Sequence, residues 1–193
     1  MYVFYRKGGS IVEDITRDHK PCDPDERSRI ENGGGRVYQS SNQLGGSMQG
    51  MTILGPTRVL PGKLSVSRTF GDVTAKFEKY GGNPKCVVAE PEIHKVTPDA
   101  DLDFIMMGSD GIFDKLSSKQ VSDAFWEEAR RNIGNKSACS FEQVSDCCGK
   151  GVDRVLNFTM ETESMDNISV VVLSYNNFAS VLAGKPQSEA SDR

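Results

Sequence analysis

Two apolar runs that enclose two amphipathic segments are the feature that most constrains this fold. The first run, residues 102–107, ends at Gly108 and predicts a buried strand, and the run 168–173 predicts another. Between them, apolar residues recur at helical spacing over about 118–131 and 141–160, which predicts two helices. The chain must therefore bury at least two strands and two helices.

The N-terminal residues predict a hairpin followed by a short helix. Residues 2–5 are aromatic and β-branched, a glycine pair follows at 8–9, and residues 11–15 indicate the returning strand. Asp23 can cap a helix that runs to about residue 30, with Glu26 completing a capping-box-like pair. This part of the chain should therefore open with two paired strands.

Three other segments are predicted to carry little regular structure. Residues 39–56 are polar and glycine-rich, which indicates a loop or an insertion. Residues 86–89 and 92–96 predict short strands that Pro91 interrupts. We expect residues 177–193, rich in Ser, Ala and Lys, to form a disordered tail.

Composition excludes several classes of protein. The chain has 23 basic and 27 acidic residues among 193, so nothing favours nucleic-acid binding or a membrane surface. Its five cysteines include no CxxC spacing, so we expect reduced thiols without a zinc site. No apolar run approaches the length of a membrane span, and the N-terminus does not read as a signal peptide. An intracellular protein, cytoplasmic or nuclear, is the expectation.

A carboxylate lies beside each of the two apolar runs. Asp110 follows the first run within Gly-Ser-Asp-Gly, and Asp166 precedes the second. If the two strands are antiparallel neighbours, both aspartates emerge at one end of one sheet. A divalent cation would remove the repulsion between them, and oxygen ligands favour Mg²⁺ or Mn²⁺. The alternative is that both are ordinary turn residues, since Asp-Gly and Asp-Asn are common in turns.

Six motifs occur in an order that resembles the type 2C metal-dependent protein phosphatases. They are Thr-Arg-Asp-His-Lys-Pro at 16–21, the 26–34 helix with its glycines, Ser-Arg-Thr-Phe-Gly-Asp at 67–72, Ala-Glu-Pro-Glu-Ile at 89–93, Gly-Ser-Asp-Gly-Ile-Phe-Asp at 108–114 and Asp-Asn-Ile-Ser-Val at 166–170. The resemblance covers about residues 1–175. It implies an α+β fold, in which two packed antiparallel β-sheets are flanked by helices.

The resemblance also implies an activity. The family hydrolyses phosphoserine and phosphothreonine on proteins, using Mg²⁺ or Mn²⁺ to activate water, with no covalent intermediate. Asp110 and Asp166 match two of its metal ligands, and no other catalytic residue is expected. Asp72, Asp114 and Gly111 match positions near the metals, although Asp114 is equally typical of a helix cap. Phosphorylated proteins are the implied partners.

Part of the family pattern is absent from these 193 residues. No Asp-Gly-His-Gly-Gly motif occurs, and its aspartate is the one that bridges both metals in the family. We therefore expect residues 1–176 to be the C-terminal portion of the domain, incomplete at the N-terminal half. Exposed sheet edges, self-association and little activity of this chain alone are expected to follow. The alternatives are a non-catalytic remnant that binds phosphoproteins or partners, and an unrelated metal-binding α+β domain.

Overall fold

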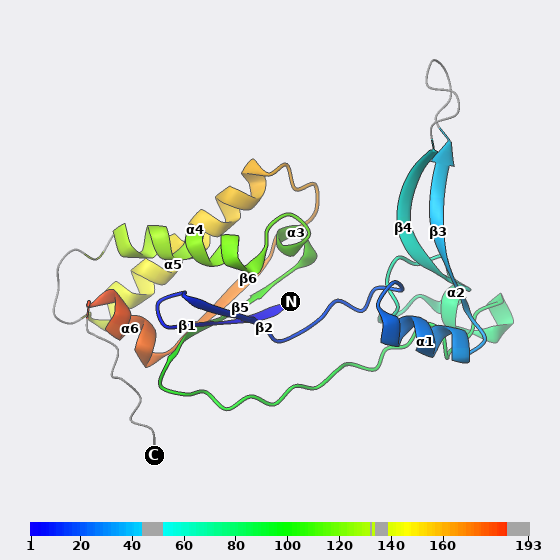
Figure 1. The fold of residues 1–193 in the computed structure, drawn as a ribbon, viewed down its shortest axis with the longest axis horizontal. Helices are drawn as coiled ribbons and strands as arrows, with labels where there is room; N and C mark the ends of the chain where they lie inside the picture. Colours follow the sequence, from blue (N-terminus) through cyan, green and yellow to red (C-terminus); the bar gives the residue numbers. More distant parts are fainter. Residues whose placement is uncertain (44–51, 132, 134–138, 185–193) are drawn as a thin grey trace. The chain divides into compact units, whose positions relative to one another are not determined.

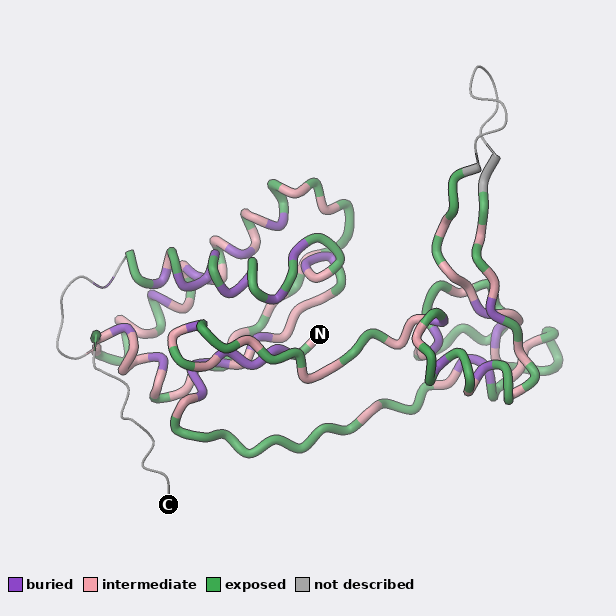
Figure 2. Tube along the Cα trace, in the orientation of Figure 1, coloured by how far each residue is buried: buried purple, intermediate pink, exposed green. Residues whose placement is uncertain are grey.

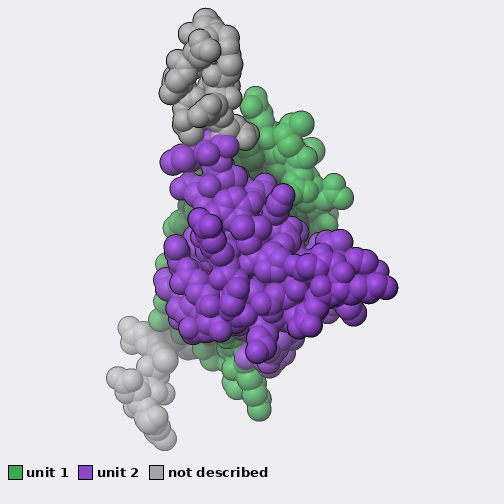
Figure 3. Space-filling model, turned by 90° about the vertical axis from the view of Figure 1, so that its right-hand side faces the viewer, with its two compact units in different colours: residues 1–17, 94–193 green, residues 18–93 purple. Residues whose placement is uncertain are grey.

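The protein is described by a computed structural model that covers residues 1–43, 52–131, 133 and 139–184. The chain divides into two compact units, coloured separately in Figure 3. Unit 1 comprises residues 1–17 and 94–193, and unit 2 comprises residues 18–93. Each unit has its own buried cluster of apolar side chains, so each is described by itself.

Unit 1 is built on a four-stranded antiparallel sheet (Figure 1). Its strands lie in the order β2 (Ile11–Asp14), β1 (Tyr2–Arg6), β5 (Leu102–Gly108) and β6 (Val170–Ser174). Pairing of β5 with β6 runs from Phe104 opposite Ser174 to Gly108 opposite Val170. The prediction that the two apolar runs are antiparallel neighbours is therefore confirmed, with β6 starting two residues later than expected.

Four helices complete unit 1. They are α3 (Asp110–Phe113), α4 (Ser118–Arg131), α5 (Phe141–Glu161) and α6 (Asn176–Leu182). A capping box between Ser140 and Gln143 fixes the start of α5. The two long helices predicted from helical spacing are thus confirmed.

Aromatic side chains fill the core between the sheet and these helices. Phe104 on β5 lies 4.5 Å from Tyr5 and 4.5 Å from Phe125 between ring centroids, and Trp126 lies 5.0 Å from Phe178. All five are nearly inaccessible to water, as the purple segments of Figure 2 show. Burial of rings at these separations is a large source of stability.

The opposite face of the sheet is partly open to solvent. The β1–β5–β6 pairing places Tyr2, Met107 and Val171 in one row, and Leu173 in the next row along β6. Tyr2, Val171 and Leu173 are each about half exposed, at 48%, 56% and 52%. This exposed apolar surface, with β2 and β6 as the sheet edges, matches the kind of surface expected from the sequence.

The segment after β6 differs from the expected disordered tail. Residues 177–182 belong to helix α6, and Phe178 is completely buried in the core. Asn177 donates from Nδ2 to Asp103 Oδ1 at 2.7 Å, and the Gly9 amide donates to the other oxygen at 3.1 Å. Phe178 and Leu182 are four residues apart, so they lie on one face of α6, and this face packs against the core of unit 1. Residues 185–193 lie outside the described part of the chain.

The described residues of unit 2 form short helices and a two-stranded hairpin. Its elements are α1 (Pro24–Asn32), β3 (Arg36–Gln43), β4 (Thr52–Leu60), α2 (Val73–Lys76) and a 3-10 turn at Glu78–Tyr80. The loop expected over 39–56 is wrong for 39–43 and 52–56, which belong to paired strands, while 44–51 lie outside the described residues. The two strands form a separate ribbon (Figure 1), and polar residues occur in them because most of their described side chains are exposed or half-buried.

The strands predicted at 86–89 and 92–96 are also wrong. The one β-contact recorded for these residues is a bridge between Val88 and Arg68. Arg29 instead binds the carbonyl oxygens of Lys85 and Cys86, at 2.8 and 3.2 Å. Guanidinium hydrogen bonds thus satisfy backbone groups that a neighbouring strand would otherwise satisfy.

Glu26 has a different role from the one predicted. Asp23 caps α1 as expected, accepting from the amides of residues 25 and 26 at 3.0 and 3.1 Å. The Glu26 carboxylate does not return to the cap. It is buried and accepts hydrogen bonds from Ser67, Arg29 and Arg68.

The cysteines and the helix hydropathy agree with the composition. None of the five cysteines, which all lie within the described ranges, forms a disulfide. Within the described ranges, no helix combines the length and the apolar character that crossing a bilayer requires.

Candidate functional site

The candidate site lies where the β5–β6 ladder ends. Beyond the last pair, Gly108 opposite Val170, the chain turns into α3 at Asp110 and arrives from the loop that contains Asp166. The two aspartates therefore emerge at the same end of the sheet. Antiparallel pairing of two strands that carry a carboxylate at their facing ends is sufficient to bring them together.

Ser109 and Ser164 hold the two loops against each other. The Ser109 amide donates to the Ser169 oxygen at 3.0 Å, and its hydroxyl donates to the Asn167 oxygen at 3.0 Å. The Ser169 amide returns a bond to the Ser109 hydroxyl at 3.1 Å. On the other side, the Ser164 hydroxyl donates to the Gly111 oxygen at 2.7 Å. These bonds fix the separation of the loops that carry the carboxylates.

Gly111 permits this close approach because it has no side chain. A Cβ atom at this position would meet the Asn167 carbonyl oxygen at 2.5 Å, closer than real Cβ contacts. The obstructing atom belongs to the backbone, so it cannot rotate away. The match of Gly111 to a position near the metals thus has a steric basis in this structure.

Three carboxylates line one pocket at this place. The pocket has a volume of about 410 Å³ and is lined by Asp110, Gly111, Asp114, Lys115, Ser164, Met165 and Asp166. Asp110 is the first residue of α3, and one Asp166 oxygen accepts from the Asn167 amide at 2.7 Å. All three aspartates are exposed, so their charges are presented to solvent and to any bound ion.

The donor set is chemically suited to a hard divalent cation. It consists of carboxylate and backbone oxygens, which Mg²⁺ and Mn²⁺ prefer over nitrogen or sulfur. However, the described residues contain no group of three or more Asp, Glu, His or Cys side chains close enough to hold a metal ion. Asp110 and Asp166 thus line one pocket, but the described residues around them do not form a complete metal cage.

The other residues singled out from the sequence lie in different places. Asp114 ends α3 and its amide donates to the Asp110 oxygen at 2.8 Å, so it closes a helix instead of starting one. Asp72 belongs to unit 2, where it precedes α2 in a left-handed conformation with φ of 50°. Arg68, also in unit 2, donates hydrogen bonds to the Glu26 carboxylate and to the Glu90 carbonyl oxygen.

Three residues of the pocket, Lys115, Ser164 and Met165, were not predicted from the sequence. None of the three belongs to a motif of the resemblance, although Lys115 and Met165 each adjoin a predicted ligand or near-ligand. The only available signal was their position next to Asp114 and Asp166 in the chain. Whether they reach the same pocket depends on the β5–β6 register.

Comparisons with known proteins agree with the fold and the motif order. The chain is 33% identical over 180 residues to the probable protein phosphatase 2C 51 of Arabidopsis thaliana, covering 92% of this chain and 29% of that protein. It is 28% identical over 176 residues to human protein phosphatase 1B, covering 91% of this chain and 30% of that protein. The chain thus spans about a third of the length of such relatives.

Solved structures show the same similarity. A phosphatase from a pathogenic strain of Toxoplasma gondii aligns with a TM-score of 0.61 and 25% identity, over 91% of this chain and 45% of that one. A sex determining protein of C. elegans aligns with a TM-score of 0.63 over 94% of this chain and 37% of that one; at 22% identity it shows the fold alone. The α+β fold with two antiparallel sheets is therefore that of these phosphatases. Since the family described as "Protein phosphatase 2C" also matches residues 1–156, the chain belongs to the protein phosphatase 2C family.

Proposed function

We propose that this chain supplies the Asp110 and Asp166 side of a metal-dependent protein serine/threonine phosphatase site. The observation that carries the proposal is the pocket at the end of β5 and β6, where both carboxylates meet. Asp114 and the Gly111 backbone adjoin them, and Asp72 of unit 2 is a further near-metal candidate by its motif. Membership of the phosphatase family supports phosphoproteins as substrates.

Asp110 and Asp166 would hold Mg²⁺ or Mn²⁺ through carboxylate oxygens. Such an ion lowers the pKa of bound water and neutralises the charge of a phosphate group. The residues of this chain orient the ligands: Ser109 and Ser164 set the spacing of the loops, and Gly111 leaves room for the approach. With two ligands and no third within the described residues, we propose weak binding of one ion.

Activity of the 193 residues alone should be near zero for the same reason. Two carboxylates cannot form the binuclear site of the family, and no Asp-Gly-His-Gly-Gly motif is present to bridge a second ion. A second candidate function follows from that observation, namely a non-catalytic module that binds phosphoproteins or partners. We further propose intracellular, cytoplasmic or nuclear, localisation, and self-association through the exposed sheet edges and the apolar face bearing Val171 and Leu173.

Mn²⁺ binding tests the assignment of the ligands directly. Titration followed by electron paramagnetic resonance of free Mn²⁺ should show one site in the wild type. Asp110→Asn and Asp166→Asn should each lower the affinity for Mn²⁺ by about tenfold or more. Loss of a group that merely hydrogen-bonds to a metal ligand already lowers metal affinity by about tenfold. Asp153→Asn, an exposed aspartate on α5, is the matched control and should leave the affinity unchanged. Equal affinities in all four proteins would reject the assignment.

Hydrolysis of a phosphothreonine peptide with Mn²⁺ separates the two candidate functions. We expect turnover near background for this chain alone. Robust turnover that disappears in Asp110→Ala would show that the 193 residues contain a complete site, against our reasoning. Phosphopeptide binding with no turnover, in any longer protein that contains these residues, would favour the binding module.

A further inference from the structure

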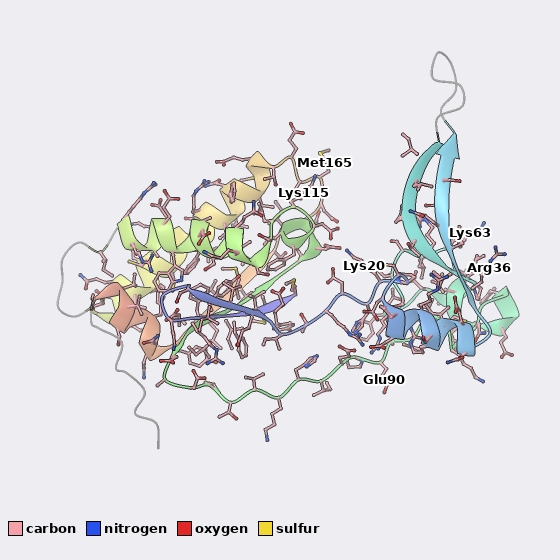
Figure 4. The ribbon with its side chains drawn as sticks, viewed as in Figure 1. Lys20, Arg36, Lys63, Glu90, Lys115 and Met165 are labelled. Atoms are coloured by element: carbon pink, nitrogen blue, oxygen red, sulfur yellow. The ribbon has the colours of Figure 1, made fainter. Side chains whose placement is uncertain are left out.

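Lys115 and Met165 lie on the same pocket as the aspartates and have no role so far. Figure 4 shows both side chains where α3 meets the loop that follows α5. We call these two residues the rim. They differ in chemistry from the rest of the lining, which is carboxylate, hydroxyl and glycine.

Met165 is almost fully exposed although its loop is firmly held. Its side chain has 96% relative exposure. On one side of it Ser164 is bonded to the Gly111 oxygen, and on the other the Asn167 oxygen accepts from Ser109. The thioether is thus presented to solvent by an anchored loop, and it loses little freedom of the backbone on contact with a ligand. Methionine adapts well to apolar side chains of varied shape.

Lys115 is the one base among the described residues that line the pocket. The structure records no hydrogen bond or ion pair from its ammonium group to any part of the chain that it describes. Its backbone is fixed, because its amide donates to the Ile112 oxygen at 3.1 Å. An exposed, unpaired ammonium beside a pocket attracts an oxyanion over a distance of several ångströms.

We propose that the rim binds phosphopeptides through two contacts, an apolar side chain close to the phosphorylated residue and an oxyanion. This inference rests on the proposed function, because the phosphate is taken to face Asp110 and Asp166. The apolar side chain packs on Met165, and an oxyanion binds Lys115. Two groups of the peptide offer that oxyanion, the phosphate itself and a neighbouring carboxylate.

Binding of non-hydrolysable phosphonate peptides to the whole chain with Mn²⁺ tests the proposal, by fluorescence anisotropy at low salt. The reference peptide has Leu and Glu beside the phosphonate residue. One arm replaces Glu by Gln, a second replaces Leu by Ser, and a third has unmodified Thr. The variants are Lys115→Gln and Met165→Gln, and Lys95→Gln is an exposed control with the same change of charge outside the pocket lining.

Lys115→Gln should weaken the reference peptide about two- to fivefold, the range expected for an exposed ion pair, and the effect should shrink in high salt. If Lys115 binds the peptide's carboxylate, Lys115→Gln should have no effect on the peptide in which Gln replaces Glu. If Lys115 binds the phosphonate, Lys115→Gln should have no effect on the peptide with unmodified Thr. Met165→Gln should weaken binding about threefold, and less in the Ser arm. Mn²⁺ affinity should be unchanged in Met165→Gln and Lys95→Gln, and it should not fall in Lys115→Gln, which removes a positive charge from the pocket.

Three results would overturn the inference. They are equal peptide affinities for Lys115→Gln and Lys95→Gln, no loss in Met165→Gln, or no binding of any peptide by the wild type. Failure of the proposed function looks different, since the wild type would then bind no Mn²⁺. In that case Met165→Gln must still weaken binding of the unmodified peptide without metal for the inference to stand.

Discussion

Replacing Glu26 by Gln should destabilise unit 2 more than any surface change on the same helix. The Glu26 side chain is 2% exposed and accepts hydrogen bonds from Arg29 at 2.7 Å and from Arg68 at 2.6 Å. Ser67 donates to the same carboxylate. Glutamine keeps the shape, but it removes the charge and points an amide donor at two guanidinium groups.

The size of the effect follows from what remains after the substitution. Removing one partner of a buried ion pair costs about 3–5 kcal/mol, because the other charge is left uncompensated. Arg29 and Arg68 keep 28% and 18% side-chain exposure, so water compensates part of their charge. We therefore expect a loss near the lower limit, about 3 kcal/mol, or about a hundredfold in the unfolding equilibrium.

Hydrogen exchange of the unit 2 amides measures this loss in the intact chain. Glu31→Gln provides the control, since it makes the same substitution on α1 in an exposed pair with Arg27 at 2.9 Å. That pair should contribute below about 0.5 kcal/mol. A loss in Glu26→Gln as small as the control's would refute the view that this buried carboxylate organises unit 2.

The same carboxylate gives unit 2 a dependence on acid. Burial alone would raise the pKa of Glu26, but hydrogen bonds from Arg68, Arg29 and Ser67 outweigh it and hold the pKa well below its usual range. A pKa lower in the folded than in the unfolded state means that the stabilisation is complete above about pH 4.3. It is lost as the pH falls from there through the folded-state pKa, and Glu26→Gln should lack this component.

Three further predictions concern unit 1. Gly111→Ala should cost about 1–3 kcal/mol in urea unfolding, because its Cβ meets the Asn167 oxygen, whereas Gly149→Ala, with no atom within 4 Å, should not destabilise. Phe178→Ala should lower the free energy of unfolding by about 3–5 kcal/mol and change Trp126 fluorescence. An unchanged free energy of unfolding would contradict the docking of α6 and favour the disordered tail expected from the sequence. Removing divalent ions with a chelator should leave the thermal midpoint unchanged, while saturating Mn²⁺ should raise it.

The parts of the fold that the sequence predicted are those with strong periodic signals. The β5 and β6 runs are largely apolar, and α4 and α5 repeat apolar residues at helical spacing. Apolar runs and helical spacing of apolar residues both indicate which side chains are buried. The two strands, the two helices and the pairing of the strands could therefore be predicted from the sequence. Once these strands pair in antiparallel register, Asp110 and Asp166 lie at the same end of the sheet.

The elements that were missed depend on contacts with distant residues. The hairpin β3–β4 is polar along most of its length, so it lacks the alternation that indicates a strand. Helix α6 is short, and its docking depends on the ring of Phe178 meeting Phe104 and Trp126. Glu26 has the local sequence of a capping box, but Arg68, 42 residues away, determines where its carboxylate lies.

The candidate site shows the same division between local and distant causes. Its frame is fixed by backbone pairing and by Ser109, so the position of Asp110 and Asp166 at one end of the sheet could be predicted from the strand ends. Their assignment as metal ligands came from the resemblance to the family and not from the strand ends. The rim has no such frame in the sequence, because Lys115 and Met165 meet only through the loops that this pairing brings together. Because the three aspartates are exposed and the aromatic core involves none of them, unit 1 can fold with the carboxylates unliganded. A cation would therefore bind a site that folding has already arranged, and the proposed ligands and the rim can be varied separately.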